Sequence, residues 1–335
     1  APAAWGGDCL YLNISAPLAV LENGDAGGRA VMVWIHGGGY TSGQGAIPWY
    51  NGNRFAKNND IVVVSINYRL GALGFVDLTH LGEEFATSNI NGTLDQIAAL
   101  QWVQDNIAAF GGDPSRVTIA GESAGGFSVA TLMACPSAEG LFQQAIPQSG
   151  ACHHTLPQEA SKKVTEHFLG ELGLRSAVEI EAASADDILI AQRATSAYFA
   201  QGAGQVNSLG VAVSPFYPVH GNTTLPDDPL TAARNGASST VRVLTGSNKD
   251  ETTLWSTGET SREKLERTVA GYQAIEALAV YQRTRPEASS HDLLVALTTD
   301  HMFRIPAIRL AEARQEAAPT FMYQFNWRSR ALNGV

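Results

Sequence analysis

Three short runs of consecutive apolar residues limit the fold of this chain more than any other feature of its sequence. They occupy residues 31–35, 61–64 and, with one threonine, 117–120. A strand with one wet face alternates apolar and polar residues, whereas a strand covered on both faces is apolar throughout. Because such strands occur mainly in parallel sheets flanked by helices, the runs predict an α/β fold with a mostly parallel central sheet.

A helical pattern lies between the second and third runs, over residues 94–109. Its apolar residues recur every three or four positions and would form one stripe facing the sheet. They are Ile97, Leu100, Val103 and Ile107. Thr93 and Gln96, three residues apart, predict a capping box at the start of this helix. The order strand, helix, strand predicts a right-handed crossover between parallel strands.

The second half of the chain is mainly helical in pattern. Helices, several of them interrupted, are expected over residues 156–172, 186–201, 261–283 and 292–317, and strands over 241–245 and 320–326. Residues 211–228, with Pro, Gly and Asn, predict an irregular connection. Because no flexible or charged linker separates independent units, we expect residues 1–335 to form a single domain. Residues 156–317 would supply helical, cap-like insertions within it.

Composition excludes several classes of partner. Hydrophobic residues make up 44% of the chain, which predicts a globular protein. The formal net charge is −10, which argues against nucleic acid or an anionic membrane as a partner, because both require clustered cations. No stretch approaches the roughly 20 apolar residues that span a bilayer. None of the three cysteines forms a C-x-x-C pair, so no metal site is indicated. A soluble protein, either cytoplasmic or secreted, is expected.

The strongest local signal is the segment Gly-Glu-Ser-Ala-Gly at residues 121–125, which fits G-x-S-x-G. It directly follows the expected strand 117–120 and directly precedes a helical pattern over 126–134. A serine on a tight turn between a strand and a helix is held in strained backbone geometry with its hydroxyl exposed above the sheet. This context predicts that Ser123 is a nucleophile.

A second signal is His-Gly-Gly-Gly-Tyr at residues 36–40, directly after the expected strand 31–35. Acyl transfer needs backbone N–H donors aimed at the oxyanion of the tetrahedral intermediate. Successive glycines let the backbone approach a substrate without a side-chain clash. Beside a nucleophilic serine, we interpret this turn as the oxyanion-binding half of the same device. His36 itself is expected to be structural.

These segments resemble the type-B carboxylesterase family, which is cholinesterase-like and para-nitrobenzyl esterase-like. Residues 110–125 (FGGDPSRVTIAGESAG) resemble the serine signature of the family, and residues 8–14 (DCLYLNI) resemble its N-terminal signature. Further segments follow in family order: NYRLG at 67–71, QSG at 148–150 and GSNKDE at 246–251. Gly7 departs from the pattern, because the family usually has an acidic residue there. The resemblance implies an α/β-hydrolase fold.

The resemblance also implies a Ser-Glu-His triad and an acyl-enzyme mechanism without a metal or cofactor. Ser123 matches the nucleophile and Glu251 the acid, with Asp250 as the alternative that spacing alone leaves open. Three residues match the oxyanion-hole donors: Gly38, Gly39 and Ala124. The expected activity is hydrolysis of uncharged, moderately apolar carboxylic esters.

The triad histidine should follow the acid and a strand similar to residues 321–327. Only His291 and His301 follow Glu251, and both are expected on helices. The resemblance therefore implies an internal fragment that lacks both ends, with the histidine beyond Val335. We expect little or no ester turnover by the 335-residue chain alone.

Some assignments rest on position alone. Tyr40, Glu122 and His153 are candidates for the substrate pocket, since each adjoins a motif or a strand end. Two alternative functions stay open: hydrolysis of carbamates or amides at the same site, and a non-catalytic cholinesterase-like binding domain. The presence of both Ser123 and Glu251 favours an enzyme. The sequence predicts no oligomeric state.

Overall fold

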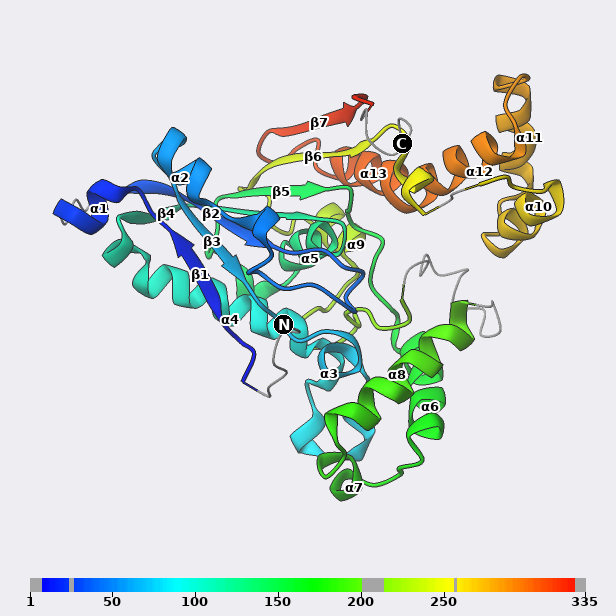
Figure 1. Cartoon of the computed structure of the whole chain (residues 1–335), viewed down its shortest axis with the longest axis horizontal. Helices are drawn as coiled ribbons and strands as arrows, with labels where there is room; N and C mark the ends of the chain where they lie inside the picture. Colours follow the sequence, from blue (N-terminus) through cyan, green and yellow to red (C-terminus); the bar gives the residue numbers. More distant parts are fainter. Residues whose placement is uncertain (1–7, 24–26, 201–213, 256–257, 329–335) are drawn as a thin grey trace.

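The computed structural model describes residues 8–23, 27–200, 214–255 and 258–328. Their centre is a seven-stranded sheet in the order β1-β3-β2-β4-β5-β6-β7 (Figure 1). The strands are β1 (Leu12–Ser15), β2 (Arg29–Ile35), β3 (Val62–Ile66), β4 (Gly112–Glu122), β5 (Gln144–Gln148), β6 (Arg242–Asn248) and β7 (Thr320–Phe325). Only β1 pairs antiparallel with its neighbour, so the predicted, mostly parallel α/β sheet is confirmed.

The three apolar runs form the middle of this sheet. They lie in β2, β3 and β4, and β2 pairs with β3 on one side and with β4 on the other. All five residues of β3 are buried, as expected for a strand covered on both faces. Because these strands are parallel, the turns that follow β2 and β4 emerge side by side at one edge of the sheet.

Helices cover the sheet and extend from it (Figure 1). Those of the first half are α1 (Leu18–Asn23), α2 (Asn53–Asn59), α3 (Gly71–Phe75), α4 (Asn91–Asn106) and α5 (Ala124–Leu132). Those of the second half are α6 (Gln158–Leu172), α7 (Ala177–Glu181), α8 (Ala185–Ala200), α9 (Pro229–Arg234), α10 (Arg262–Gly271), α11 (Ile275–Thr284), α12 (Ser290–Thr299) and α13 (Ile305–Ala313). Short 3₁₀ turns span Pro48–Tyr50, Thr79–Leu81, Glu83–Phe85, Ser88–Ile90, Ile107–Phe110, Pro136–Ala138 and Glu251–Leu254.

The expected helix over 94–109 exists, but its predicted capping box is wrong. Helix α4 begins at Asn91, so Thr93 lies inside its first turn, and no side chain caps its start. Gln96 is buried and donates from Nε2 to the hydroxyl of Ser128 on α5, at 2.9 Å. The side chain that the pattern assigned to the helix end therefore links α4 to α5.

The predicted long helices of the second half are interrupted. The pattern over 261–283 is split into α10 and α11, and the pattern over 292–317 into α12, a π-helical turn (Asp300–Arg304) and α13. Within the expected connection over 211–228, residues 214–228 have little regular structure before α9, apart from a bridge between Leu156 and Val219. Gly7 and residues 201 and 211–213 lie outside the described residues.

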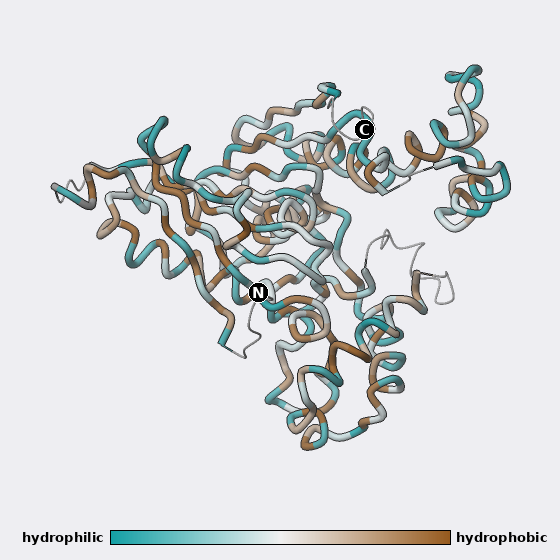
Figure 2. The backbone as a smooth tube through the Cα atoms, viewed as in Figure 1, coloured by the Kyte–Doolittle hydropathy of each residue, from teal (hydrophilic) through white to brown (hydrophobic). Residues whose placement is uncertain are grey.

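Buried apolar side chains form three clusters. Hydrophobic residues are frequent along the central strands, as the brown segments of the backbone in Figure 2 show. The largest cluster surrounds the sheet and includes Val33, Ile119 and Phe127. A small one joins Cys152 to α9 and α13, and a third lies among α10, α11 and α12. The extent of a single domain over residues 1–335 stays a prediction.

Candidate active site

Ser123 lies on the turn between β4 and α5. Its backbone has φ 56° and ψ −122°, a conformation that non-glycine residues rarely adopt. The turn is held because the Ser123 amide donates to the carbonyl of Gln148 on β5 at 3.0 Å, and the Phe127 amide donates to the Ser123 carbonyl at 2.9 Å. A strained serine between a strand and a helix is the local geometry that the G-x-S-x-G segment predicts.

The glycines of the motif permit this turn through close packing of backbone on backbone. A β-carbon on Gly125 would overlap the carbonyl oxygen of Ile35, the last residue of β2. A β-carbon on Gly121 would lie 2.5 Å from the backbone of Gly125. Any larger residue at either position would push the helix away from the sheet, so the motif needs glycine for steric reasons.

The triple-glycine turn lies directly against Ser123. A β-carbon on Gly37 would lie 3.2 Å from Cβ of Ser123 and 3.0 Å from Oε2 of Glu122. Gly38 and Gly39 have φ values of 116° and 63°, which only glycine adopts without strain. Two motifs that are 84 residues apart in the sequence, from Gly39 to Ser123, thus meet because β2 and β4 are neighbours.

The three predicted oxyanion donors belong to the two turns that meet at Gly37 and Ser123. No hydrogen bond from the amides of Gly38 or Gly39 to another group is recorded among the described residues. Ala124 is the first residue of α5, so its N–H has no helical carbonyl to bind. The positive end of the α5 dipole also points toward Ser123. This arrangement fits an oxyanion site, although the roles of the three residues stay predictions.

The buried side chain of His36 contacts the glycine turn. Its ring is buried, stacks on Tyr68 with centroids 4.5 Å apart, and its Nδ1 lies 2.8 Å from the carbonyl oxygen of Gly37. The hydroxyl of Tyr68 donates to the His36 carbonyl at 2.9 Å. Burial lowers the pKa of His36, which favours a neutral ring. These contacts fit the structural role expected for His36.

Glu251 is the residue predicted to be the triad acid. It follows β6, and its carboxylate accepts hydrogen bonds from the Asn248 amide at 2.7 Å and from Asn248 Nδ2 at 2.8 Å. Burial of the Glu122 carboxyl, and secondly the negative charge of Glu251, raise the pKa of Glu122 to about 7. Glu251 is therefore close enough for its charge to act on Glu122, the residue before Ser123.

Two predicted pocket residues lie elsewhere. Tyr40 is completely buried, packs edge-on against Phe75 and Tyr217, and accepts a hydrogen bond from Ser128 at 3.2 Å. Its ring is part of the largest apolar cluster around the sheet.

His153 has a different environment from the one expected. Its Nε2 lies 3.5 Å from Nη1 of Arg309 on α13, and no contact with Ser123 is recorded among the described residues. Burial and the charge of Arg309 lower its pKa to about 4. The neighbouring His154 is fully buried and stacks on Phe127 with centroids 3.4 Å apart. Of the three pocket candidates, only Glu122 lies beside Ser123.

Sequence reasoning missed the residues that hold Glu251 in place. The Glu251 amide donates to the hydroxyl of Thr299 at 3.1 Å, and Arg304 donates to the carbonyl of Lys249 at 2.5 Å. Thr299 and Arg304 lie some 50 residues beyond the loop that carries Glu251. Contacts across such a separation leave no periodic trace in the sequence, so local patterns could not predict them.

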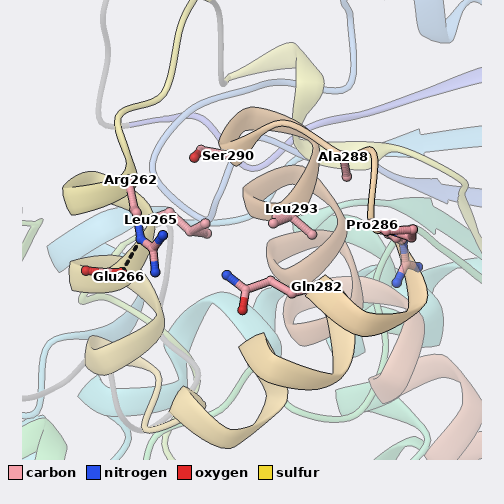
Figure 3. Close-up of a pocket in the computed structure, with 9 residues that line it drawn as sticks. Arg262, Leu265, Glu266, Gln282, Pro286, Ala288, Ser290 and Leu293 are labelled. Atoms are coloured by element: carbon pink, nitrogen blue, oxygen red, sulfur yellow. Dashed lines mark hydrogen bonds and ion pairs between the residues drawn. The ribbon is translucent and has the colours of Figure 1, made fainter.

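Two cavities open away from Ser123. One, of about 250 Å³, lies among α10, α11 and α12, where Leu265, Gln282 and Leu293 converge (Figure 3). Another, of about 600 Å³, lies between α9 and the end of α13. Neither contains a predicted site residue. In the described part of the chain, no helix has the length and apolar character needed for a membrane crossing, and no cluster of His, Cys, Asp and Glu has a metal-binding arrangement.

Known proteins with similar sequences are esterases and hydrolases. The chain is 36% identical over 339 residues to the para-nitrobenzyl esterase of Bacillus subtilis, covering 96% of this chain and 63% of that protein. It is 33% identical over 342 residues to the phenmedipham hydrolase of Pseudarthrobacter oxydans, covering 98% of this chain and 64% of that protein. The chain thus spans less than two thirds of the length of these relatives.

Solved structures show the same fold. A PNB esterase superposes with a TM-score of 0.83 at 35% identity, over 98% of this chain and 68% of that one. A carboxylesterase of Geobacillus stearothermophilus gives a TM-score of 0.83 at 35% identity, over 99% of this chain and 70% of that one. These likenesses confirm the α/β-hydrolase fold. The model of the carboxylesterase family matches residues 5–334, and the chain therefore belongs to the carboxylesterase family.

Proposed function

We propose that the protein hydrolyses carboxylic esters, with Ser123 as the nucleophile. The observation that carries this proposal is the contact between the triple-glycine turn and Ser123, a strained serine at the carboxyl edge of a parallel sheet. Membership of the carboxylesterase family supports the reaction class. Since Ser123 and Glu251 are both present, a non-catalytic binding domain is disfavoured.

In the proposed reaction the Ser123 hydroxyl attacks the ester carbonyl carbon. The carbonyl oxygen becomes an oxyanion that accepts hydrogen bonds from the amides of Gly38, Gly39 and Ala124. Each such donor typically contributes about 3 kcal/mol to the stability of the transition state. The alcohol leaves with a proton, and water then hydrolyses the acyl-enzyme and regenerates the serine.

A histidine has to carry the proton between Ser123, the leaving alcohol and water. No described histidine makes a recorded hydrogen bond to Ser123, and His36 is engaged with Gly37 and Tyr68. We assign the role to a histidine outside the described residues, as the family resemblance implies. Glu251 would hold that ring in the correct tautomer and stabilise its protonated form.

The substrate class follows from the charge of the site. Glu122, next to Ser123 in the chain, and Glu251, whose charge acts on Glu122, both carry carboxyl groups. These would repel an anionic substrate, so uncharged esters fit better. Carbamates and amides could react at the same serine, but the lower reactivity of their carbonyl groups makes esters the primary class.

The test uses the natural full-length protein with p-nitrophenyl butyrate and the matching p-nitroanilide. We expect an initial burst of p-nitrophenol and faster turnover of the ester than of the anilide. A fluorophosphonate probe should label Ser123, and Ser123→Ala should lower turnover by about 10⁶-fold. Retained activity in Ser123→Ala would contradict the nucleophile assignment, and faster anilide turnover would favour the amide alternative.

A further inference from the structure

The loop that carries Glu251 makes hydrogen bonds to one distant segment of the chain. We call residues 248–252 the acid loop, and residues 298–304 the anchor segment. Thr299 Oγ1 accepts hydrogen bonds from the amides of Glu251 at 3.1 Å and Thr252 at 3.5 Å. The hydroxyls of Thr252 and Thr298 lie 2.6 Å apart. The anchor segment therefore fixes the carboxyl-terminal half of the acid loop.

Arg304 fixes the other half of the acid loop. Its Nη2 donates to the carbonyl of Lys249 at 2.5 Å and lies 3.5 Å from the carbonyl of Asn248. Asn248 is the residue whose amide and side chain both bind the Glu251 carboxylate. The guanidinium thus acts on the backbone of the residue that orients the carboxylate, without a recorded contact to that carboxylate itself.

Arg304 is in turn oriented by Asp300, one π-helical turn earlier. Its Nη1 donates to Asp300 Oδ1 at 2.6 Å, and the hydroxyl of Tyr281 on α11 donates to the second oxygen of Asp300. The side chains of Arg304 and Asp300 are only 19% and 15% exposed. Arginine presents several donors in a rigid plane, so it can bind a carboxylate and a carbonyl at once.

The π-helical turn explains why this arginine reaches the acid loop. Helix α12 would continue directly into α13, but the wider turn at Asp300–Arg304 interrupts it. π-Helical turns are rare in proteins, but those that occur often lie at functional sites. They change the direction of side chains relative to a regular helix. Here the turn lies beside the carboxyl end of β6, where the acid loop begins.

We propose that Arg304, oriented by Asp300, is a positioning residue that keeps the Glu251 carboxylate aligned for catalysis. This inference rests on the proposed function, because it requires Glu251 to act as the triad acid. A purely structural anchor would affect the stability of the protein alone. A positioning residue also affects the chemical step, since small displacements of a catalytic group cost up to about 100-fold in rate.

The experiment measures kcat and KM of the natural full-length protein with p-nitrophenyl butyrate. Arg304→Met removes the guanidinium, and Arg304→Lys keeps the positive charge but removes the planar set of donors. Asp300→Asn removes the charged partner that orients Arg304. Arg262→Met is the matched control, because Arg262 also pairs with an acid four residues away, Glu266, but on the exposed surface of α10. Thermal unfolding of each variant reports whether it is folded.

We expect Arg304→Met to lower kcat about 10- to 100-fold with KM within twofold. Arg304→Lys and Asp300→Asn should give smaller losses, and Arg262→Met none. In a Glu251→Gln background, Arg304→Met should cost less than about threefold, because the group it positions is already gone. Should Arg304→Met not fold, the two milder variants measured in the same Glu251→Gln background decide the question.

Two results would overturn the inference while leaving the proposed function intact. One is an unchanged kcat in folded Arg304 and Asp300 variants of an active enzyme. The other is the same fold-loss with and without Glu251, which would show that Arg304 acts independently of it. If the wild-type protein does not hydrolyse the ester, or if Ser123→Ala retains turnover, the proposed function fails and the inference falls with it.

Discussion

Gly37 and Ser123 lie so close together that a β-carbon on the glycine would be 3.2 Å from Cβ of the serine. The same β-carbon would lie 2.7 Å from the carbonyl oxygen of Glu122. Gly37 and Ser123 lie just after two neighbouring strands, β2 and β4. Their contact joins the glycine turn to the serine turn. The two turns can therefore pack this closely only because residue 37 has no β-carbon.

Gly37→Ala should therefore lose activity. The added methyl would push the serine turn and the glycine turn apart, and we expect kcat to fall about 100-fold because the oxyanion donors would be displaced. Stability should fall by about 1–3 kcal/mol, as for other overpacked sites. Initial rates and urea unfolding of the purified variant measure both effects.

Gly170→Ala provides the control for Gly37→Ala. Gly170 is exposed on α6, and no atom lies within 4 Å of the place a β-carbon would take. Alanine in a helix interior should raise the free energy of unfolding by about 0.5–1 kcal/mol and leave kcat unchanged. Equal losses of activity in both glycine variants would refute the steric argument.

Ser123 should also limit stability through its backbone. With φ at 56°, any residue with a β-carbon is strained at this position, at a cost of about 1–3 kcal/mol. We expect Ser123→Gly to unfold at a higher urea concentration than Ser123→Ala, although both are inactive. Identical unfolding midpoints would show that the turn stores no strain.

Glu122 should make stability depend on pH. Its pKa is raised to about 7 in the folded chain, mainly by burial and secondly by Glu251, from an ordinary value near 4.5. Between these two values the unfolded chain gives up the proton and the folded chain keeps it, so stability falls as pH rises and the loss is complete above about 7. Glu122→Gln should remove this loss.

Urea unfolding at pH 5 and pH 8 measures the effect of Glu122. The difference in stability between Glu122→Gln and wild type should shift in favour of the variant at pH 8. Glu139→Gln, on the exposed turn after Pro136–Ala138, serves as the control and should show no such shift. A variant effect that is the same at both pH values would contradict the raised pKa of Glu122.

Arg69 and Asp95 form a part-buried ion pair. The Asp95 carboxylate accepts from the Arg69 amide at 2.9 Å and from Nε and Nη2 at 2.8 Å each. Breaking a buried pair leaves one group without its partner, so Asp95→Asn should lower the free energy of unfolding by about 3 kcal/mol. Glu266→Gln, which breaks the exposed pair with Arg262, should have no measurable effect on urea unfolding. Similar losses in the two variants would show that burial does not decide the strength of these pairs.

Local patterns in the sequence determined the strands and the chemistry of the turns. The apolar runs of β2, β3 and β4 predict a buried parallel sheet, because no other arrangement covers both faces of a strand. The glycines around Ser123 and those of residues 37–39 predict their turns because only glycine fits there. The predicted capping box at Thr93 is wrong, since α4 begins at Asn91 and the Gln96 side chain instead donates to Ser128 on α5.

Only the tertiary structure decided which distant residues meet. Tyr40 and His153 adjoin the motifs in sequence, yet one fills the core and the other faces Arg309. The charge of Glu251 acts on Glu122, and Arg304 contacts the acid loop from 55 residues further along the chain. The physical reason is that local sequence sets backbone conformation, whereas contacts between strand ends depend on the strand order of the whole sheet.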